Sequence, residues 1–238
     1  MHAAISFQQV SLSLHDTPIL HNITGHFPKG QITTLVGPSG AGKTTVLKLC
    51  NALLSPTTGT ILYNEQPLHV YEPTVLRQSI GIALQAAPMI DGTVFDNLAL
   101  PYRLQSKTLS KQAASEALEV VGLRQELLHT PARKLSGGQR QKVSIARTLM
   151  NDADILLLDE ITSALDPHAV AEIESLVLSM KARGVTVIWI THHLEQAKRI
   201  GDYMWMMQHG QLIESGPCHL LEHSSHEVVQ QFMRGELK

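Results

Sequence analysis

The strongest chemical signal in the sequence is a glycine-rich loop that ends in a lysine and two threonines. Glycines let the backbone wrap around a phosphate group, and the helix that follows points its N–H groups and its positive dipole end at the anion. Lys43 is then expected to bridge the β and γ oxygens of a nucleoside triphosphate, and Thr44 to offer its hydroxyl to Mg²⁺. The predicted phosphate-binding residues are Gly37, Pro38, Ser39, Gly40, Ala41, Gly42, Lys43, Thr44 and Thr45.

Two consecutive acidic residues follow an apolar run, Ile155 to Leu158. Such a run predicts a strand buried on both faces, and ligands of open α/β sheets bind at the C-terminal ends of such strands. We expect Asp159 to hold Mg²⁺ through a water molecule. Glu160 is expected to orient and deprotonate the water that attacks the γ-phosphorus. The alternative for Glu160 is a solvated acid at the start of a loop or helix.

Gln85 follows another predicted strand, Ile80 to Leu84. A neutral amide can contact both Mg²⁺ and the attacking water without adding charge, so we predict a catalytic and metal-binding role for it. The alternative is an exposed glutamine at a strand end.

A second helix start carries the stretch Ser136, Gly137, Gly138 and Gln139. Its hydroxyl and closely approaching backbone predict a second anion site. A chain of this size cannot readily fold that stretch onto its own phosphate loop, because a long helical segment separates the two. The second anion site is therefore expected to lie apart from the phosphate loop of the same chain.

These residues need an α/β scaffold to position them. Strands are predicted at residues 31–36, 60–63, 80–84, 155–158, 185–190, 204–207 and 211–214, and helices at 42–52 and 193–200. A further helix should start at Pro167 with Asp166 as its N-cap. Residues 92–149 are mostly helical in pattern, with Ser110 as an N-cap. The opening residues alternate as antiparallel strands around a turn at residues 15–18.

The fold prediction is therefore an α/β protein with a P-loop NTPase core and a mostly parallel sheet. An N-terminal antiparallel β subdomain and an inserted α-helical subdomain complete it. We expect one domain over residues 1–238. Its catalytic core is predicted at about 1–86 and 151–220, its helical subdomain at about 87–150 and its helical tail at 221–238.

Composition narrows the function classes. Of the 238 residues 43% are hydrophobic, enough for a core, and the net charge of −2 with no Lys/Arg block gives no sign of a nucleic-acid partner. Two cysteines exclude a disulfide framework, and the 13 histidines are scattered rather than grouped as metal ligands. We find no signal peptide and no run of 18 apolar residues. A membrane function would thus require separate membrane-spanning chains.

Together, the phosphate loop, the stretch Leu135 to Gln139 and the Asp159-Glu160 pair resemble the ATP-binding subunit of an ABC transporter. The resemblance runs from about residue 5 to residue 220. It implies an ATPase with ATP and Mg²⁺ as cofactors, and a homodimer that sandwiches two ATP molecules. It also implies that His192 contacts the γ-phosphate and that the loop ending in Asp166 crosses the dimer interface.

Two positions depart from the pattern of that family. Leu14 stands where the family usually has an aromatic residue to stack on adenine, and His15 could substitute for it. Ile161 stands where a proline often follows the catalytic glutamate. The sequence of residues 159–166, together with that of residues 91–98, is similar to Fet-type iron-efflux ATPases. It is also similar to phosphate-import-like ATPases and to a plant aluminium-tolerance ATP-binding subunit.

The resemblance implies a role at the cytoplasmic face of the cell membrane, with an integral membrane permease as partner. The segment at residues 85–105 is expected to receive a helix of that permease, with ordinary loop and core packing as the alternative. Export of a metal ion or small solute is predicted, with import as the alternative. A soluble ABC-type ATPase of DNA repair or translation is a weaker reading, because this chain lacks long coiled-coil or tandem-domain insertions and a basic stripe. A small-molecule or nucleotide kinase is also weaker, because it needs an acceptor pocket and gives Ser136 to Gly138 no role. An ATP-binding regulator that never hydrolyses is disfavoured by the presence of Gln85, Glu160 and His192.

Overall fold

A six-stranded sheet forms the centre of the computed structural model, which describes residues 2–221, 223–234 and 236. Its strand order is β10-β9-β3-β8-β7-β6, and all neighbours are parallel except β10, which runs antiparallel to β9. The strands are β3 (Ile32–Val36), β6 (Ile80–Ala83), β7 (Ile155–Asp159), β8 (Thr186–Ile190), β9 (Tyr203–Gln208) and β10 (Gln211–Pro217). Every residue of β3, β7 and β8 is buried, as the apolar runs at residues 155–158 and 185–190 predicted for β7 and β8.

A second, antiparallel sheet has the order β2-β1-β4-β5. It comprises β1 (Ala3–Leu14), β2 (Thr17–Pro28), β4 (Thr58–Tyr63) and the short β5 (Gln66–Pro67). Leu14 pairs with Thr17, and His15 and Asp16 between them have φ angles of 46° and 62°. The predicted turn at residues 15–18 was therefore too long, because a two-residue hairpin loop with positive φ already reverses the chain.

Nine α-helices occur in the described residues. They are α1 (Lys43–Cys50), α2 (Pro73–Ser79), α3 (Val94–Leu104), α4 (Lys111–Val120), α5 (Gly137–Leu149), α6 (Pro167–Ala182), α7 (Leu194–Ile200), α8 (Cys218–Leu221) and α9 (Glu227–Met233). Both predicted caps are confirmed: the Ser110 side chain accepts from the N–H of Ala113, and the Asp166 side chain accepts from those of His168 and Ala169. Such caps satisfy N–H groups that the first helical turn leaves unpaired.

The long helical pattern at residues 92–149 resolves into three separate α-helices, and two short 3₁₀ turns, Gln125–His129 and Ala132–Lys134, lie between α4 and α5. Helix α2 and strand β5 were not predicted at all. Only Leu76 of α2 is buried, so its sequence lacks the apolar periodicity that identifies a helix. Glu72 starts this helix by accepting from the N–H groups of Thr74 and Val75.

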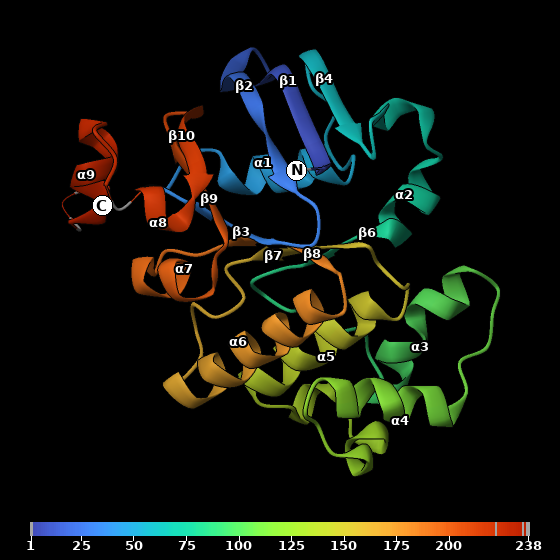
Figure 1. Cartoon of the computed structure of the whole chain (residues 1–238). Helices are drawn as coiled ribbons and strands as arrows, with labels where there is room; N and C mark the ends of the chain where they lie inside the picture. Colours follow the sequence, from blue (N-terminus) through green and yellow to red (C-terminus); the bar gives the residue numbers. More distant parts are fainter. Residues whose placement is uncertain (1, 222, 235, 237–238) are drawn as a thin grey trace.

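Hydrophobic side chains cover both faces of the central sheet, and the helices and strands that carry them lie on its two sides (Figure 1). On one face lie α1 and the antiparallel sheet, where Phe27 stacks on Trp205 with ring centroids 4.2 Å apart. On the other face lie α3 to α6, with the buried Trp189 among them. The sheet is thus held rigidly between two cores, and its C-terminal edge is left open to build a site.

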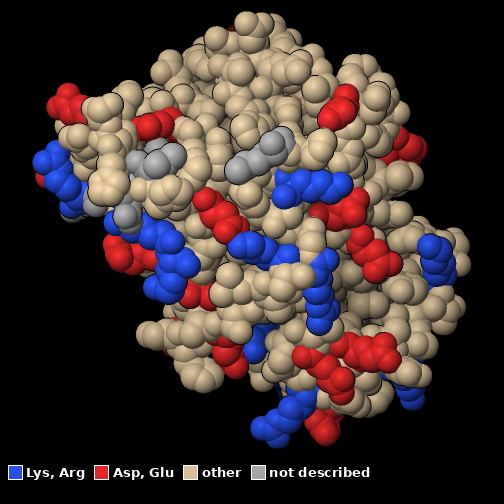
Figure 2. Space-filling model, in the orientation of Figure 1, with Lys and Arg blue, Asp and Glu red and all other residues tan. Residues whose placement is uncertain are grey.

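The surface mixes charges of both signs. Figure 2 shows Lys and Arg side chains interspersed with Asp and Glu side chains on one face, mainly over the helices. Within the part of the chain that the structure describes, no helix combines the length and the apolar character needed to cross a membrane.

Candidate functional site

The glycine-rich loop joins β3 to α1, and its backbone geometry requires glycine at particular positions. Gly37 has a φ of 138°, and a Cβ there would lie 2.0 Å from the carbonyl oxygen of Met207. Gly42 has a φ of 95° and occupies the N-cap of α1 with no side-chain cap for the first N–H groups. The helix N-terminus is therefore available to an anion.

Lys43 is folded back onto this loop. Its ammonium donates hydrogen bonds of 2.8 Å to the carbonyl oxygens of Gly37 and Pro38. Burial lowers the pKa of Lys43, and the nearby carboxylates of Glu160 and Asp159 oppose that shift. The loop carbonyls thus hold the cation where a phosphate would offer stronger, charged acceptors.

Thr44 and Asp159 bring the ends of two segments together. The Thr44 hydroxyl donates to Oδ1 of Asp159 at 3.1 Å. Burial raises the pKa of Asp159, an effect that the Thr44 hydrogen bond opposes, as do Lys48 and Lys43. A hydroxyl beside a partly desolvated carboxylate is a suitable pair of oxygen ligands for Mg²⁺, which takes its remaining ligands from phosphate and water.

Glu160 follows β7 directly and faces His192, which follows β8. Nε2 of His192 lies 2.5 Å from Oε1 of Glu160. The backbone of Glu160 has a φ of 51°, an unusual value for a residue with a side chain, and its N–H donates to the Ile190 carbonyl at 3.1 Å. Strain of this kind persists where the surrounding structure fixes it, and it turns the Glu160 side chain toward the loop pocket.

Gln85 lies at one remove from these groups. Its Nε2 donates to Oγ of Ser163 at 3.0 Å, and that hydroxyl donates to the carbonyl oxygen of Glu160, also at 3.0 Å. The carbonyl oxygen of Gln85 accepts from the side-chain amide of Gln141 on α5 at 2.5 Å. Gln85 therefore joins the Glu160 turn to the helical segment, rather than lining the pocket itself.

One pocket of about 320 Å³ collects most of the predicted catalytic and phosphate-binding side chains. Gly37, Pro38 and Asp159 do not line the pocket themselves. The carbonyl oxygens of Gly37 and Pro38 accept hydrogen bonds from Lys43, and Asp159 accepts one from Thr44, and both donors line it. The pocket is lined by Ile19, Ser39, Gly40, Ala41, Gly42, Lys43, Thr44, Thr45, Glu160 and His192. Ile19 was not predicted from the sequence, because its position depends on how the antiparallel sheet packs against the loop.

Leu14 is not among the residues that line this pocket. It is 39% exposed at the tip of the β1–β2 hairpin. An apolar side chain at that exposed position can contact a base, but it supplies no aromatic ring for stacking.

The second predicted group gathers in a different hollow, of about 430 Å³. Ser136, Gly137, Gly138 and Gln139 line it together with Asp166, and it shares no lining residue with the first pocket. Ser136 and Gln139 form a reciprocal capping box, in which the Ser136 hydroxyl accepts from the Gln139 N–H and the Ser136 N–H donates to the Gln139 side chain. Within one chain, the two predicted anion sites thus remain apart.

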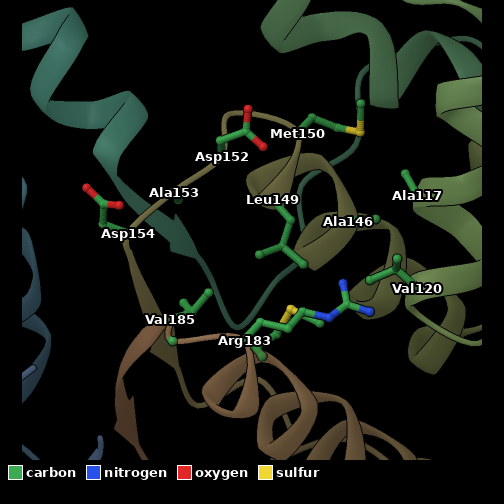
Figure 3. Close-up of a pocket in the computed structure, with 12 residues that line it drawn as sticks. Ala117, Val120, Ala146, Leu149, Met150, Asp152, Ala153, Asp154, Arg183 and Val185 are labelled. Atoms are coloured by element: carbon green, nitrogen blue, oxygen red, sulfur yellow. The ribbon is translucent and has the colours of Figure 1, made fainter. Parts of the chain in front are cut away.

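A third cavity, of about 390 Å³, lies at the opposite edge of the sheet (Figure 3). Leu149, Val120 and Val185 face it, and Asp154 and Arg183 lie at its rim. Asp154 directly precedes β7 and Val185 directly precedes β8, so this cavity adjoins strand starts. Ligands of open α/β sheets bind beyond the C-terminal ends of the strands instead, so this cavity is on the wrong edge of the sheet for a nucleotide.

A parallel strand, a glycine-rich loop, a helix and a carboxylate at the end of a neighbouring strand define a P-loop nucleoside triphosphatase. Residues 20–163 match the family model described as ABC transporter, and the chain belongs to that family. It is the ATP-binding subunit of an ABC transporter and an ATPase, and the fold predicted from the sequence is confirmed.

Individual relatives agree with this assignment. The chain is 41% identical to YjkB of Bacillus subtilis, named as an ABC transporter ATP-binding protein, over 98% of this chain and 94% of that protein. It is 39% identical to the methionine import ATP-binding protein MetN of Photorhabdus laumondii, over 97% of this chain and 68% of MetN. A dimeric post-hydrolysis structure of the ATP-binding cassette MJ0796 with ADP and Pi superposes with a TM-score of 0.81. That comparison has 26% identity and covers 90% of this chain and 98% of the other.

Proposed function

We propose that two copies of this chain close head to tail around two molecules of Mg-ATP and thereby drive a separate membrane permease. The observation that carries the proposal is the separation of the two predicted anion sites. The phosphate loop with Glu160 and His192 lines one pocket, and Ser136 to Gln139 with Asp166 lines another. Each site is incomplete within one chain, and a partner copy supplies the missing half.

In this proposal each residue at the loop has a defined task. The backbone N–H groups of the loop and Lys43 bind the β- and γ-phosphates, and Thr45 and Ser39 add hydroxyl contacts. Thr44 and Asp159 would hold Mg²⁺, and Gln85 is proposed as a further ligand. The ion would neutralise part of the phosphate charge. The Ser136 hydroxyl and the helix start behind it contact the γ-phosphate of the partner's nucleotide.

Hydrolysis follows from the Glu160 and His192 pair. The carboxylate of Glu160 accepts a proton from water while the water oxygen bonds to the γ-phosphorus and the bond to the β–γ bridging oxygen breaks. His192 contacts the γ-phosphate and fixes the Glu160 carboxylate. Closure requires the γ-phosphate, so its loss reopens the dimer and returns the permease to its other state.

The permease contact is proposed at residues 85–105. Gln85 connects this segment to the Glu160 turn, so occupancy of the nucleotide pocket can be transmitted to it. Ala86 and Pro88 are exposed and Met89 and Ile90 partly so, which suits the apolar face of a helix. Such a contact would hold the subunit at the cytoplasmic face of the cell membrane. We propose no nucleic-acid partner, because the net charge is −2 and the sequence has no Lys/Arg block.

The direction of transport has two candidates. The wording of residues 91–98 favours export of a metal ion or small solute, as in Fet-type ATPases. The name of the 39% identical relative, a methionine import protein, favours import. Vesicles that contain the partner permease, with the subunit and Mg-ATP on the outside, distinguish the two: solute accumulates inside for an exporter and leaves for an importer.

The dimer itself is tested by measuring the molecular mass of the Glu160→Gln variant in solution, with and without Mg-ATP. This change removes the proton acceptor but keeps the size and polarity of the side chain, so Mg-ATP should bind and remain intact. We expect a monomer without nucleotide and a dimer with Mg-ATP. A mass that stays monomeric at saturating Mg-ATP contradicts the proposal.

A further inference from the structure

We infer that Gln196 is a positioning residue for hydrolysis, because its side-chain amide ties the Glu160 turn to the His192 turn. The inference rests on the catalytic roles proposed above for Glu160 and His192. Gln196 lies on α7, and its side chain is buried, with 3% of the residue exposed. It touches neither reacting group and acts through two threonines.

Both turns donate to a single oxygen. Oε1 of Gln196 lies 3.2 Å from the hydroxyl of Thr162, two residues after Glu160. The same oxygen lies 2.7 Å from the hydroxyl of Thr191, one residue before His192. Thr191 also accepts from the N–H of His193 at 3.1 Å, so the turn that carries His192 is held on both sides.

The orientation of the amide is fixed from behind. Nε2 of Gln196 donates to Oε1 of Glu174 on α6 at 2.9 Å. Arg199 donates to both carboxylate oxygens of Glu174, at 3.0 and 2.6 Å, and lowers the pKa of Glu174 despite its burial. An ionised carboxylate only accepts, so the nitrogen of Gln196 must face Glu174 and its oxygen must face the threonines.

The arrangement decides how well Glu160 and His192 stay aligned. Glu160 sits at a strained φ of 51°, and its contact with His192 spans two loops from different strands. Thr162, Thr191, Gln196 and Glu174 are all buried. Removal of the central amide therefore leaves two buried hydroxyl donors without their acceptor, while Glu174 loses one donor and keeps Arg199. The two loops would then move independently of each other, and the side chains of Glu160 and His192 would no longer be held in contact.

The first test is Gln196→Met, which keeps the length of the side chain and removes the amide. We expect kcat for ATP hydrolysis to fall about 10- to 100-fold, the range that a displacement of about 1 Å can cost. The KM for ATP should stay within about twofold, because the phosphate loop is untouched. The control is Tyr63→Phe, which removes a partly buried 2.7 Å hydrogen bond to Asp154 at the opposite edge of the sheet and should leave kcat unchanged.

The second test is Gln196→Glu, read as a ratio of kcat to that of the wild type from pH 6 to pH 9. When protonated, the new carboxyl can donate to Glu174 and accept from Thr162 and Thr191, as the amide does. When ionised, the new carboxylate faces the carboxylate of Glu174 on α6, and the two repel. Arg199 is already bonded to Glu174 and so does not neutralise the added charge. The ratio should approach one at low pH and fall as pH rises.

The outcomes separate this inference from the proposed function. If Glu160→Gln abolishes hydrolysis while folded Gln196→Met retains wild-type kcat, the positioning role is wrong and the proposed function stands. A pH-independent ratio for Gln196→Glu also overturns the positioning role, and it decides the matter if Gln196→Met does not fold. If Glu160→Gln itself hydrolyses ATP normally, the proposed function fails first.

Discussion

Nε2 of His192 lies 2.5 Å from Oε1 of Glu160, although the two residues follow different strands and are 32 positions apart in the chain. The parallel pairing of β7 with β8 explains the contact, because Asp159 is in register with Ile190 and both turns therefore leave the sheet at the same edge. The proposed general base and its neighbour are thus brought together by the backbone pairing of two strands.

The first prediction concerns Glu160→Gln in single-turnover measurements. Loss of the proton acceptor should reduce the rate of ATP cleavage by about 10²- to 10⁴-fold, the usual contribution of a general base. The affinity for Mg-ATP should remain close to that of the wild type. Glu195→Gln is a matched control, since Glu195 lies on the exposed side of α7. Normal cleavage by Glu160→Gln would assign the base to another residue.

Asp159→Asn is predicted to stabilise the free protein and to weaken its response to Mg-ATP. Burial raises the pKa of Asp159 in the folded protein above its ordinary value of 3.8. The folded state then binds more protons than the unfolded state, so this group costs stability as pH rises through the folded pKa, and the full cost applies above it. Asparagine carries no such cost and can still accept from Thr44.

Calorimetry without nucleotide or metal checks the first half: the variant should melt at a higher temperature at pH 7, by a margin that narrows toward acid pH. The second half is the rise in melting temperature on addition of Mg-ATP, which should be smaller for the variant because the proposed metal ligand has lost its charge. A variant that melts lower than the wild type at pH 7 without ligands contradicts the assigned electrostatics.

Glycine substitutions in the phosphate loop should differ sharply in their effect. At Gly40, φ is 78° and a Cβ would meet no atom within 4 Å, so Gly40→Ala should cost about 1–2 kcal/mol of folding free energy. At Gly37 the same change would place the Cβ 2.0 Å from a backbone oxygen of Met207. Gly37→Ala should therefore destabilise more than Gly40→Ala in urea unfolding. Equal midpoints would show that the loop moves freely away from β9.

The sequence predicted those parts of the site that depend on local chemistry. The loop at Gly37 to Thr45, the acidic pair after β7 and the caps Ser110 and Asp166 follow from residue type and neighbours. The contacts of Gln196 could not be predicted, because Thr162, Thr191 and Glu174 reach it from three segments that only the packed fold brings together. The apolar pattern likewise failed for α2, where exposure on nearly every side leaves no periodicity.

The final prediction uses two substitutions of Ser136 that differ only in charge. Asparagine and aspartate both cap helices about as well as serine, and aspartate is further favoured by the helix dipole. Both variants should therefore keep the start of α5 folded, with a free energy of unfolding within about 0.5 kcal/mol of the wild type. Only aspartate would place a negative charge where the partner's γ-phosphate is proposed to bind.

In the Glu160→Gln background, Ser136→Asn should still dimerise with Mg-ATP, although less tightly, whereas Ser136→Asp should remain monomeric at the same nucleotide concentration. Light scattering measures the mass, and binding of a fluorescent ATP analogue confirms that each monomer still holds nucleotide at its own phosphate loop. Dimerisation of Ser136→Asp to the same extent as Ser136→Asn would place the γ-phosphate away from the start of α5. The hollow lined by Ser136 and Asp166 would then need a different ligand.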